Sequence, residues 1–188
     1  MKGPFAAMIA AIMAWLGLAQ GAAAGSARLN WDAVPLPAID GTNFEVGRFQ
    51  GKVVLVVNTA SKCGFTPQYE GLEALWRDYR DKGLVVLGVP SNDFGSQEPG
   101  SNAEVVSFCQ INYGVDFPLM AKQQVVGEGA HPLYRWAAAQ TGPLGVPRWN
   151  FHKLLIGRDG TLVDWFATTT TPDAPRLRAA IDKALAAP

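Results

Sequence analysis

The sequence predicts an α/β fold in which a mixed central sheet is flanked by helices. Two apolar runs, residues 52–58 and 84–89, lack the alternation of a half-exposed strand, which is typical of strands buried on both faces. Segments with helical spacing separate and follow these runs, and a hairpin signal comes later in the chain. Helical crossovers and an antiparallel hairpin together indicate a mixed sheet.

The first predicted elements lead up to a cysteine. Residues 44–49 alternate like a short edge strand, and the first buried strand follows them. Thr66 and Pro67 then resemble an N-cap and a first helical residue, and apolar side chains recur at helical spacing until Gly83. We therefore expect a helix that begins three residues after Cys63.

The second half of the chain continues the same alternation of strands and helices after the second buried strand. Its predicted elements are a loop over 90–101, a helix over 103–113 closed by Gly114, a short strand over 117–120, a helix over 132–140, strands over 149–156 and 161–166 around a turn, and a last helix opened by Pro172. A thioredoxin-like layer fits this order best.

Residues 1–24 are predicted to form a signal peptide, and residues 25–188 a single domain. Lys2 precedes an apolar stretch over residues 5–19, which is shorter than the about 20 residues of a membrane-spanning helix. Small residues around Ala24 offer a cleavage site. We expect an exported protein, periplasmic or secreted, without stable membrane insertion after cleavage; an uncleaved N-terminal anchor is the alternative.

Composition and charge exclude several classes of protein. The chain is 48% hydrophobic, and its 16 basic residues balance 16 acidic ones, so we expect neither disorder nor a nucleic-acid partner. Cys63 and Cys109, with His131 and His152, match no zinc or haem spacing, and no metal or cofactor is predicted. For the two histidines we expect surface or structural roles.

Cys63 is the candidate nucleophile. It lies between a buried strand and a predicted helix N-terminus, where the helix dipole and the adjacent Lys62 favour a thiolate. No second cysteine follows three positions later, so direct dithiol exchange is disfavoured. Ionisation alone accelerates a reaction only modestly, so hydrogen-bond donors directed at a leaving oxygen are also required.

Three blocks of the sequence carry a family resemblance. Residues 58–69, N-T-A-S-K-C-G-F-T-P-Q-Y, resemble the peroxidatic segment of the glutathione peroxidase family. Residues 90–100 are similar to its second signature and residues 149–151, W-N-F, to its third, and the resemblance covers about residues 43–185. It implies a non-selenium, cysteine-type peroxidase with a catalytic tetrad, whose members here are Cys63, Gln97, Trp149 and Asn150.

Cys109 has two interpretations. It could be a small hydrophobic residue in the core of its helix. Alternatively, the surrounding F-C-Q-I-N-Y-G resembles the resolving segment of family members that use thioredoxin-like reductants. In that case a sulfenic acid on Cys63 condenses with Cys109 to a redox-active disulfide, after local unwinding of the helix. The resemblance implies a thioredoxin-like protein or glutathione as reductant.

The resemblance also implies a substrate class. The segment between Gln140 and Trp149 is short, as in monomeric members with an open site, so hydrogen peroxide and organic or lipid hydroperoxides are expected substrates in a response to oxidative stress.

Asp93 departs from the commonest pattern, where many members have Gln, which leaves the hydrogen bonding of its loop open. A peroxide-sensing relay to a partner protein and a purely structural disulfide are the alternative functions.

Overall fold

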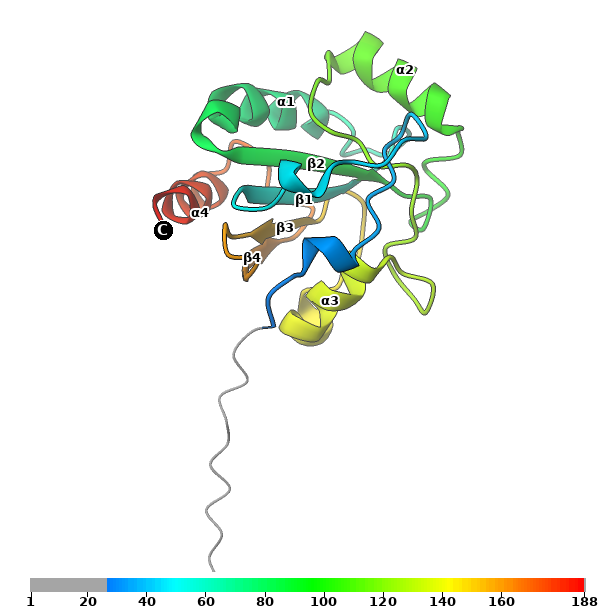
Figure 1. Ribbon diagram of the computed structural model, residues 1–188. Helices are drawn as coiled ribbons and strands as arrows, with labels where there is room; N and C mark the ends of the chain where they lie inside the picture. The colour runs from blue at the N-terminus through cyan, green and yellow to red at the C-terminus, as the bar shows by residue number, and fades with distance from the viewer. Residues whose placement is uncertain (1–26, 188) are drawn as a thin grey trace, which may run out of the picture.

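The computed structural model describes residues 27–187, and the predicted signal peptide lies outside them. Four strands form one sheet in the order β2-β1-β3-β4, with helices on both faces (Figure 1). The elements are β1 (Val53–Thr59), α1 (Gln68–Tyr79), β2 (Leu84–Pro90), α2 (Asn102–Tyr113), α3 (Pro132–Thr141), β3 (Lys153–Ile156), β4 (Leu162–Phe166) and α4 (Pro175–Ala186).

The sheet is mixed, as expected from the sequence. β1 pairs in parallel with β2 and antiparallel with β3, and β4 closes the hairpin with β3. Alternate side chains of β1 enter two different cores. Leu55 packs into the core that α1 and α4 cover, whereas Val54 and Val56 pack into the core formed with α3 and the N-terminal segment. Because both faces are covered, the strand is apolar at nearly every position.

Two predicted strands are wrong. Residues 44–49 contain a short 3-10 helix, Val46–Arg48, because local backbone bonds such as Phe49 N–H to the Val46 carbonyl replace pairing with a neighbour. Residues 117–120 form only isolated bridges, to Gly88 and to Ala38. Pro118 lacks the N–H that a regular ladder needs, which accounts for the interruption.

Two predicted boundaries lie too early. β3 begins at Lys153 rather than at residue 149, because Phe151 has φ +63° and leaves the extended conformation. α4 begins at Pro175 rather than at Pro172. The Ala174 N–H donates to the Thr171 carbonyl in a preceding turn, so the second proline opens the helix.

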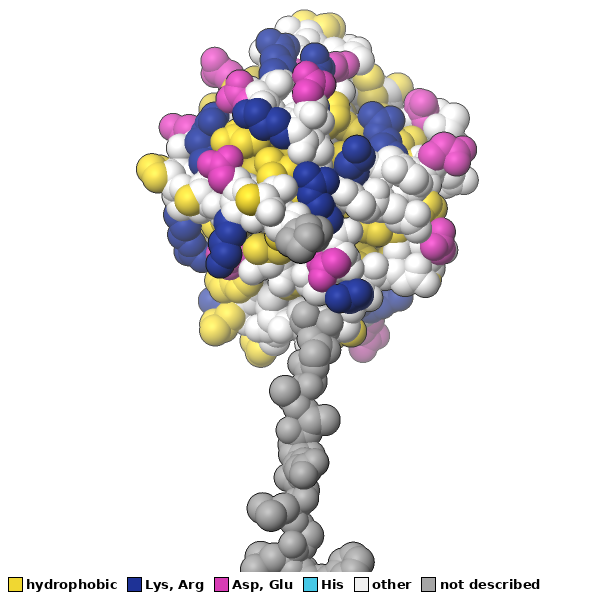
Figure 2. Space-filling model, turned by 60° about the vertical axis from the view of Figure 1, so that its left-hand side comes forward, with side chains coloured by type: hydrophobic (Ala, Val, Ile, Leu, Met, Phe, Trp, Pro, Cys, Tyr) yellow, Lys and Arg dark blue, Asp and Glu magenta, His cyan; other side chains and the backbone are white. Residues whose placement is uncertain are grey.

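The surface has no dominant charge on the face shown in Figure 2, where Lys and Arg side chains alternate with Asp and Glu. This mixture agrees with the balanced composition of the chain. Within residues 27–187, no helix has both the length and the apolar character required to cross a membrane.

Candidate active site

Cys63 lies in a series of turns between β1 and α1. Its N–H donates to Thr66 Oγ1 at 3.0 Å, and that hydroxyl donates to the Ala60 carbonyl at 2.9 Å. The N–H of Phe65 points at Cys63 Sγ, 3.4 Å away. Thr66 therefore braces the cysteine turn instead of capping the helix, and α1 begins at Gln68, five residues after Cys63 rather than the three predicted. The buried sulfur thus receives a backbone N–H donor.

Three distant segments meet at this turn. The Lys62 N–H donates to the Gln97 carbonyl at 3.0 Å, and Asn150 Nδ2 donates to Gln97 Oε1 at 2.9 Å. Asn58, near the end of β1, donates from Nδ2 to the Trp149 carbonyl at 3.0 Å. The structure therefore joins Gln97 and Asn150 directly and ties both of their segments to the strand and turn that carry the cysteine.

Trp149 takes a more open position than its two neighbours in the predicted tetrad. Its side chain is 38% exposed, and its ring packs against Phe94 with centroids 6.0 Å apart. Asn150, by contrast, is fully buried. Trp149 and Phe94 thus form an aromatic rim beside the partly buried Gln97–Asn150 pair.

The turn at Asn150 depends on an unusual backbone conformation in the next residue. Phe151 has φ +63°, in the left-handed region that non-glycine residues rarely occupy. Its N–H donates to the Asn58 carbonyl, and its ring packs edge-on against Tyr69 at 5.4 Å. The Asn150 carbonyl accepts a bond from Thr168 Oγ1 at 2.8 Å. These contacts hold the Asn150 side chain toward Gln97.

Asp93 organises the loop that carries Gln97. Its Oδ2 accepts the N–H groups of Val125 and Val126 at 2.6 Å and 3.2 Å. Asn92 Oδ1 accepts the Glu98 N–H at 2.8 Å, on the other side of Gln97. The residue that departs from the family pattern therefore ties this loop to the segment before α3.

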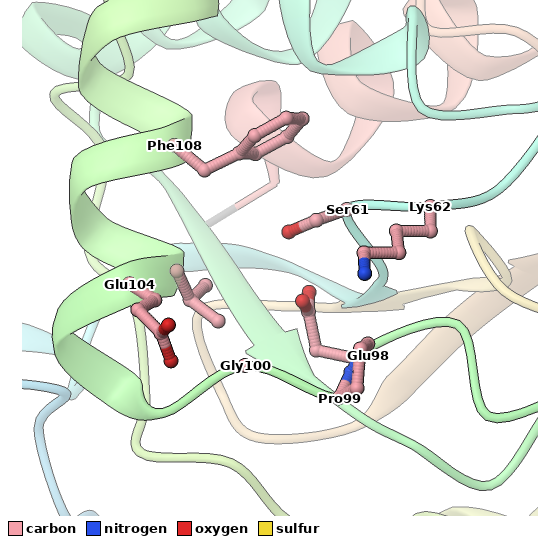
Figure 3. A pocket seen from close by; sticks show the side chains of 8 residues that line it. Ser61, Lys62, Glu98, Pro99, Gly100, Glu104 and Phe108 are labelled. Carbon is pink, nitrogen blue, oxygen red and sulfur yellow. The ribbon is translucent and has the colours of Figure 1, made fainter.

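A cavity of about 390 Å³ lies between the cysteine turn and α2 (Figure 3). The carboxylate of Glu98 points into it beneath Ser61, and burial raises the pKa of this group. Lys62 and Lys122 partly oppose that rise through their charges. The cavity is lined by Ser61, Lys62, Glu98, Pro99, Gly100, Glu104, Val105 and Phe108.

Cys109 is a buried free thiol in α2, and Cys63 is also free. Burial raises the pKa of Cys109 to about 11, although a contact with the Tyr69 hydroxyl opposes the rise. Both sulfurs belong to the same apolar cluster, on the α1 side of the sheet. The Cys109 thiol is therefore protonated near neutral pH and unreactive while it stays buried.

Both histidines are buried. His131 caps α3 by accepting the Leu133 N–H at Nδ1, and its Nε2 lies 2.8 Å from the Pro35 carbonyl. His152 stacks on Trp165, and burial lowers its pKa to about 4. Both histidines therefore have structural positions in the interior and do not lie on the surface. Within residues 27–187, no group of three His, Cys, Asp or Glu side chains is placed to hold a metal ion.

Sequence reasoning missed the buried polar residues that support the site. Lys153 is fully buried at the start of β3, and Asn58 and Glu98 are buried beside the cysteine turn and its neighbouring loop. A lysine at the head of an otherwise apolar strand was the available signal, because charged side chains are rarely placed in a core without a partner.

Comparisons with known proteins agree with this geometry. The sequence profile of the glutathione peroxidase family matches residues 33–138. A glutathione peroxidase-like peroxiredoxin of Schizosaccharomyces pombe is 51% identical over 136 residues, 71% of this chain and 86% of that one. A hydroperoxy fatty acid reductase of Synechocystis is 44% identical over 79% of this chain and 91% of its own. The crystal structure of apo Trgpx, 38% identical, aligns with a TM-score of 0.68 over 86% of this chain and 99% of that one.

Proposed function

Since this chain belongs to the glutathione peroxidase family, has its thioredoxin-like fold and is a peroxidase, we propose that Cys63 is the nucleophile with which it reduces peroxides. The observation that carries this proposal is the meeting of three segments at the cysteine turn. The hydrogen-bonded amides of Gln97 and Asn150, and the Phe65 N–H near the sulfur, supply neutral donors in a partly buried setting. Such donors stabilise charge that develops in a transition state.

In the proposed reaction, the thiolate sulfur of Cys63 attacks the distal oxygen of the peroxide. A sulfur–oxygen bond forms while the oxygen–oxygen bond breaks, which leaves a sulfenic acid on Cys63. The departing oxygen takes up one proton and leaves as water or an alcohol. Gln97, Trp149 and Asn150 are proposed to stabilise the thiolate and this departing oxygen; their catalytic roles stay predictions.

Cys109 is the proposed resolving residue. Its thiol attacks the sulfenic sulfur, so that a disulfide forms and water leaves. A thioredoxin-like dithiol then reduces the disulfide and becomes oxidised itself, while glutathione can compete at the sulfenic acid. Because Cys109 is fully buried in α2, the helix must open locally before the two sulfurs reach bonding distance, about 2.05 Å.

Substitution of each cysteine tests these roles separately. Cys63→Ser should abolish peroxide turnover with either reductant, whereas Cys109→Ser should form the sulfenic acid normally and stall with thioredoxin. Steady-state assays and mass spectrometry after one equivalent of peroxide measure both outcomes. Full turnover by Cys63→Ser would contradict the mechanism. Oxidation of wild-type Cys63 without turnover would favour the sensing relay, and a disulfide that does not cycle would favour a structural bridge.

The proposed substrates include bulky hydroperoxides. Trp149 is partly exposed, so the aromatic rim that it forms with Phe94 is accessible from solvent. One relative is named a hydroperoxy fatty acid reductase. We therefore expect turnover of a fatty acid hydroperoxide as well as hydrogen peroxide, in assays that compare the two. Turnover of hydrogen peroxide alone would contradict the wider range.

Export and a monomeric state are further proposals, which rest on the sequence. Processing after Ala24 should give a mature chain that begins at Gly25, which N-terminal sequencing of the exported protein detects. A retained Met1 would contradict cleavage. Light scattering should give the mass of one chain, and a mass of two or more chains would contradict the monomer.

A further inference from the structure

Lys153 is a buried lysine that contacts two segments next to the proposed site. Its side chain has no exposed surface, and Nζ donates to Gln68 Oε1 at 2.7 Å and to the Phe151 carbonyl at 2.8 Å. No ion pair that the structure shows within residues 27–187 includes this lysine. Burial of a charge is costly, so an uncharged side chain of similar size would suit packing alone better.

Both acceptors belong to segments that build the site. Gln68 is the first residue of α1, which follows the cysteine turn, and Phe151 comes directly after Asn150. Gln68 Nε2 donates to the Thr168 carbonyl, and Thr168 Oγ1 donates to the Asn150 carbonyl, each at 2.8 Å. The ammonium is therefore the centre of a buried network that connects both segments.

The network also holds the strained backbone at Phe151. A non-glycine residue in the left-handed region is strained, so neighbouring contacts must maintain it. The Phe151 N–H is held by the Asn58 carbonyl on β1, and its carbonyl is held by Lys153. The lysine thereby stabilises the turn that directs Asn150 toward Gln97.

We propose that Lys153 is a positioning residue for peroxide reduction: its charged ammonium holds the Asn150–Phe151 turn and the first residue of α1 in place, so that Asn150 stays directed toward Gln97. This role rests on the proposed function of Cys63. It needs no contact between Lys153 and the peroxide.

The role predicts a characteristic pH dependence. Burial lowers the pKa of Lys153 to about 7, so its positive charge is lost as the pH rises through neutrality. The pKa of His152 is lowered to about 4 and the pKa of Tyr69 is raised well above its usual value, so both neighbours are neutral near pH 7. The cross-strand partners of Lys153 are the apolar Val57 on β1 and Phe166 on β4, and the uncharged Gln68 contacts it from α1. Arg176 lies over the Phe166 ring and is paired with Asp164.

The test follows Cys63 oxidation in a single turnover of the reduced protein from about pH 5 to about pH 9. Above about pH 7 the wild-type rate constant should fall relative to that of Lys153→Met at the same pH, because the lysine loses its charge there. Lys153→Met should react about tenfold more slowly at pH 6. The exposed Lys183→Met is the matched control and should behave as the wild type.

A second variant separates position from charge. Thr168→Val removes the donor to the Asn150 carbonyl but keeps the lysine, so it should slow the reaction and retain the fall above pH 7. The proposal is wrong if folded Lys153→Met reacts as fast as the wild type, or is slowed equally at every pH. Should Lys153→Met not fold, a Thr168→Val rate equal to the wild type would overturn it. If peroxide does not oxidise Cys63 in the wild-type protein, the proposed function itself is wrong.

Discussion

Asn150 is held by its side chain and its backbone at once. Its amide donates to Gln97, its carbonyl accepts from Thr168, and the next residue turns the chain through the left-handed region. The two hydrogen-bond partners, Gln97 and Thr168, come from different parts of the sequence. A donor fixed in this way needs no reorganisation during the reaction, which is the condition under which it contributes most to catalysis.

Asn150→Ala should therefore slow Cys63 oxidation by about a hundredfold, the usual cost of a lost transition-state donor. Stopped-flow measurement of sulfenic acid formation checks this value. Asn43→Ala, at an exposed position, is the control and should react at the wild-type rate. An Asn150→Ala rate within a factor of about two of the wild type would remove Asn150 from the tetrad.

α2 is the helix that the proposed resolving step would have to open, and few of its side chains are buried. It buries two of its twelve side chains, Val105 and Cys109, whereas Ile111 is 79% exposed. A capping box between Ser101 and Glu104 holds its first turn. Segments with few buried contacts open at the lowest free energy. The proposed resolving thiol is therefore buried in a helix with few buried side chains.

Gly114→Ala should speed disulfide formation. Gly114 ends α2 with φ +60°, a conformation that costs alanine about 1 kcal/mol, so the helix should open about fivefold more often. Quenched time points analysed by mass spectrometry give the rate of disulfide formation after sulfenic acid appears. Gly51→Ala, at φ +68° in the turn before β1, is the control. Equal acceleration in both variants would show that opening of α2 does not limit resolution.

At the scale of the whole fold, the described part of the chain has two apolar cores, one on each face of the sheet. Side chains of β1 and β2 alternate between them, so neither core can be lost without exposing the other. We therefore expect a single cooperative unfolding transition. His152, buried against Trp165 near the start of β3, links the stability of this unit to pH.

The free energy of unfolding should fall as the pH decreases from about 6.5 toward about 4. The native pKa of His152 is about 4, below the value of 6.5 for an unperturbed histidine, so the unfolded chain binds the proton first. The full loss from this group is about 3 kcal/mol. Urea titrations of wild type and His152→Gln at several pH values measure it. Burial also lowers the pKa of His131, so the variant should still lose some stability with falling pH, with a smaller slope of unfolding free energy against pH. A slope equal to that of the wild type would contradict the role of His152.

Much of the fold follows from local patterns. The two uninterrupted apolar strands predict burial on both faces, and the segment before Gly114 predicts α2 to within one residue at its start. The failures lie where tertiary contacts overrule local preference. Phe151 is an aromatic residue in a left-handed turn, and nothing in its own residue type predicts that conformation. Its hydrogen bonds and its packing on Tyr69 maintain it.

The layered α/β architecture, the family and the candidate nucleophile can all be identified before folding is considered, because periodic apolar residues and short ordered motifs are local properties of the chain. The meeting of polar groups is different, since it depends on the folded arrangement. The Gln97–Asn150 contact, the tie from Asp93 to Val125 and the buried Lys153 network each join residues from separate segments. Such contacts form only when packing brings those segments together, because the donors and acceptors are satisfied by water until the chain folds.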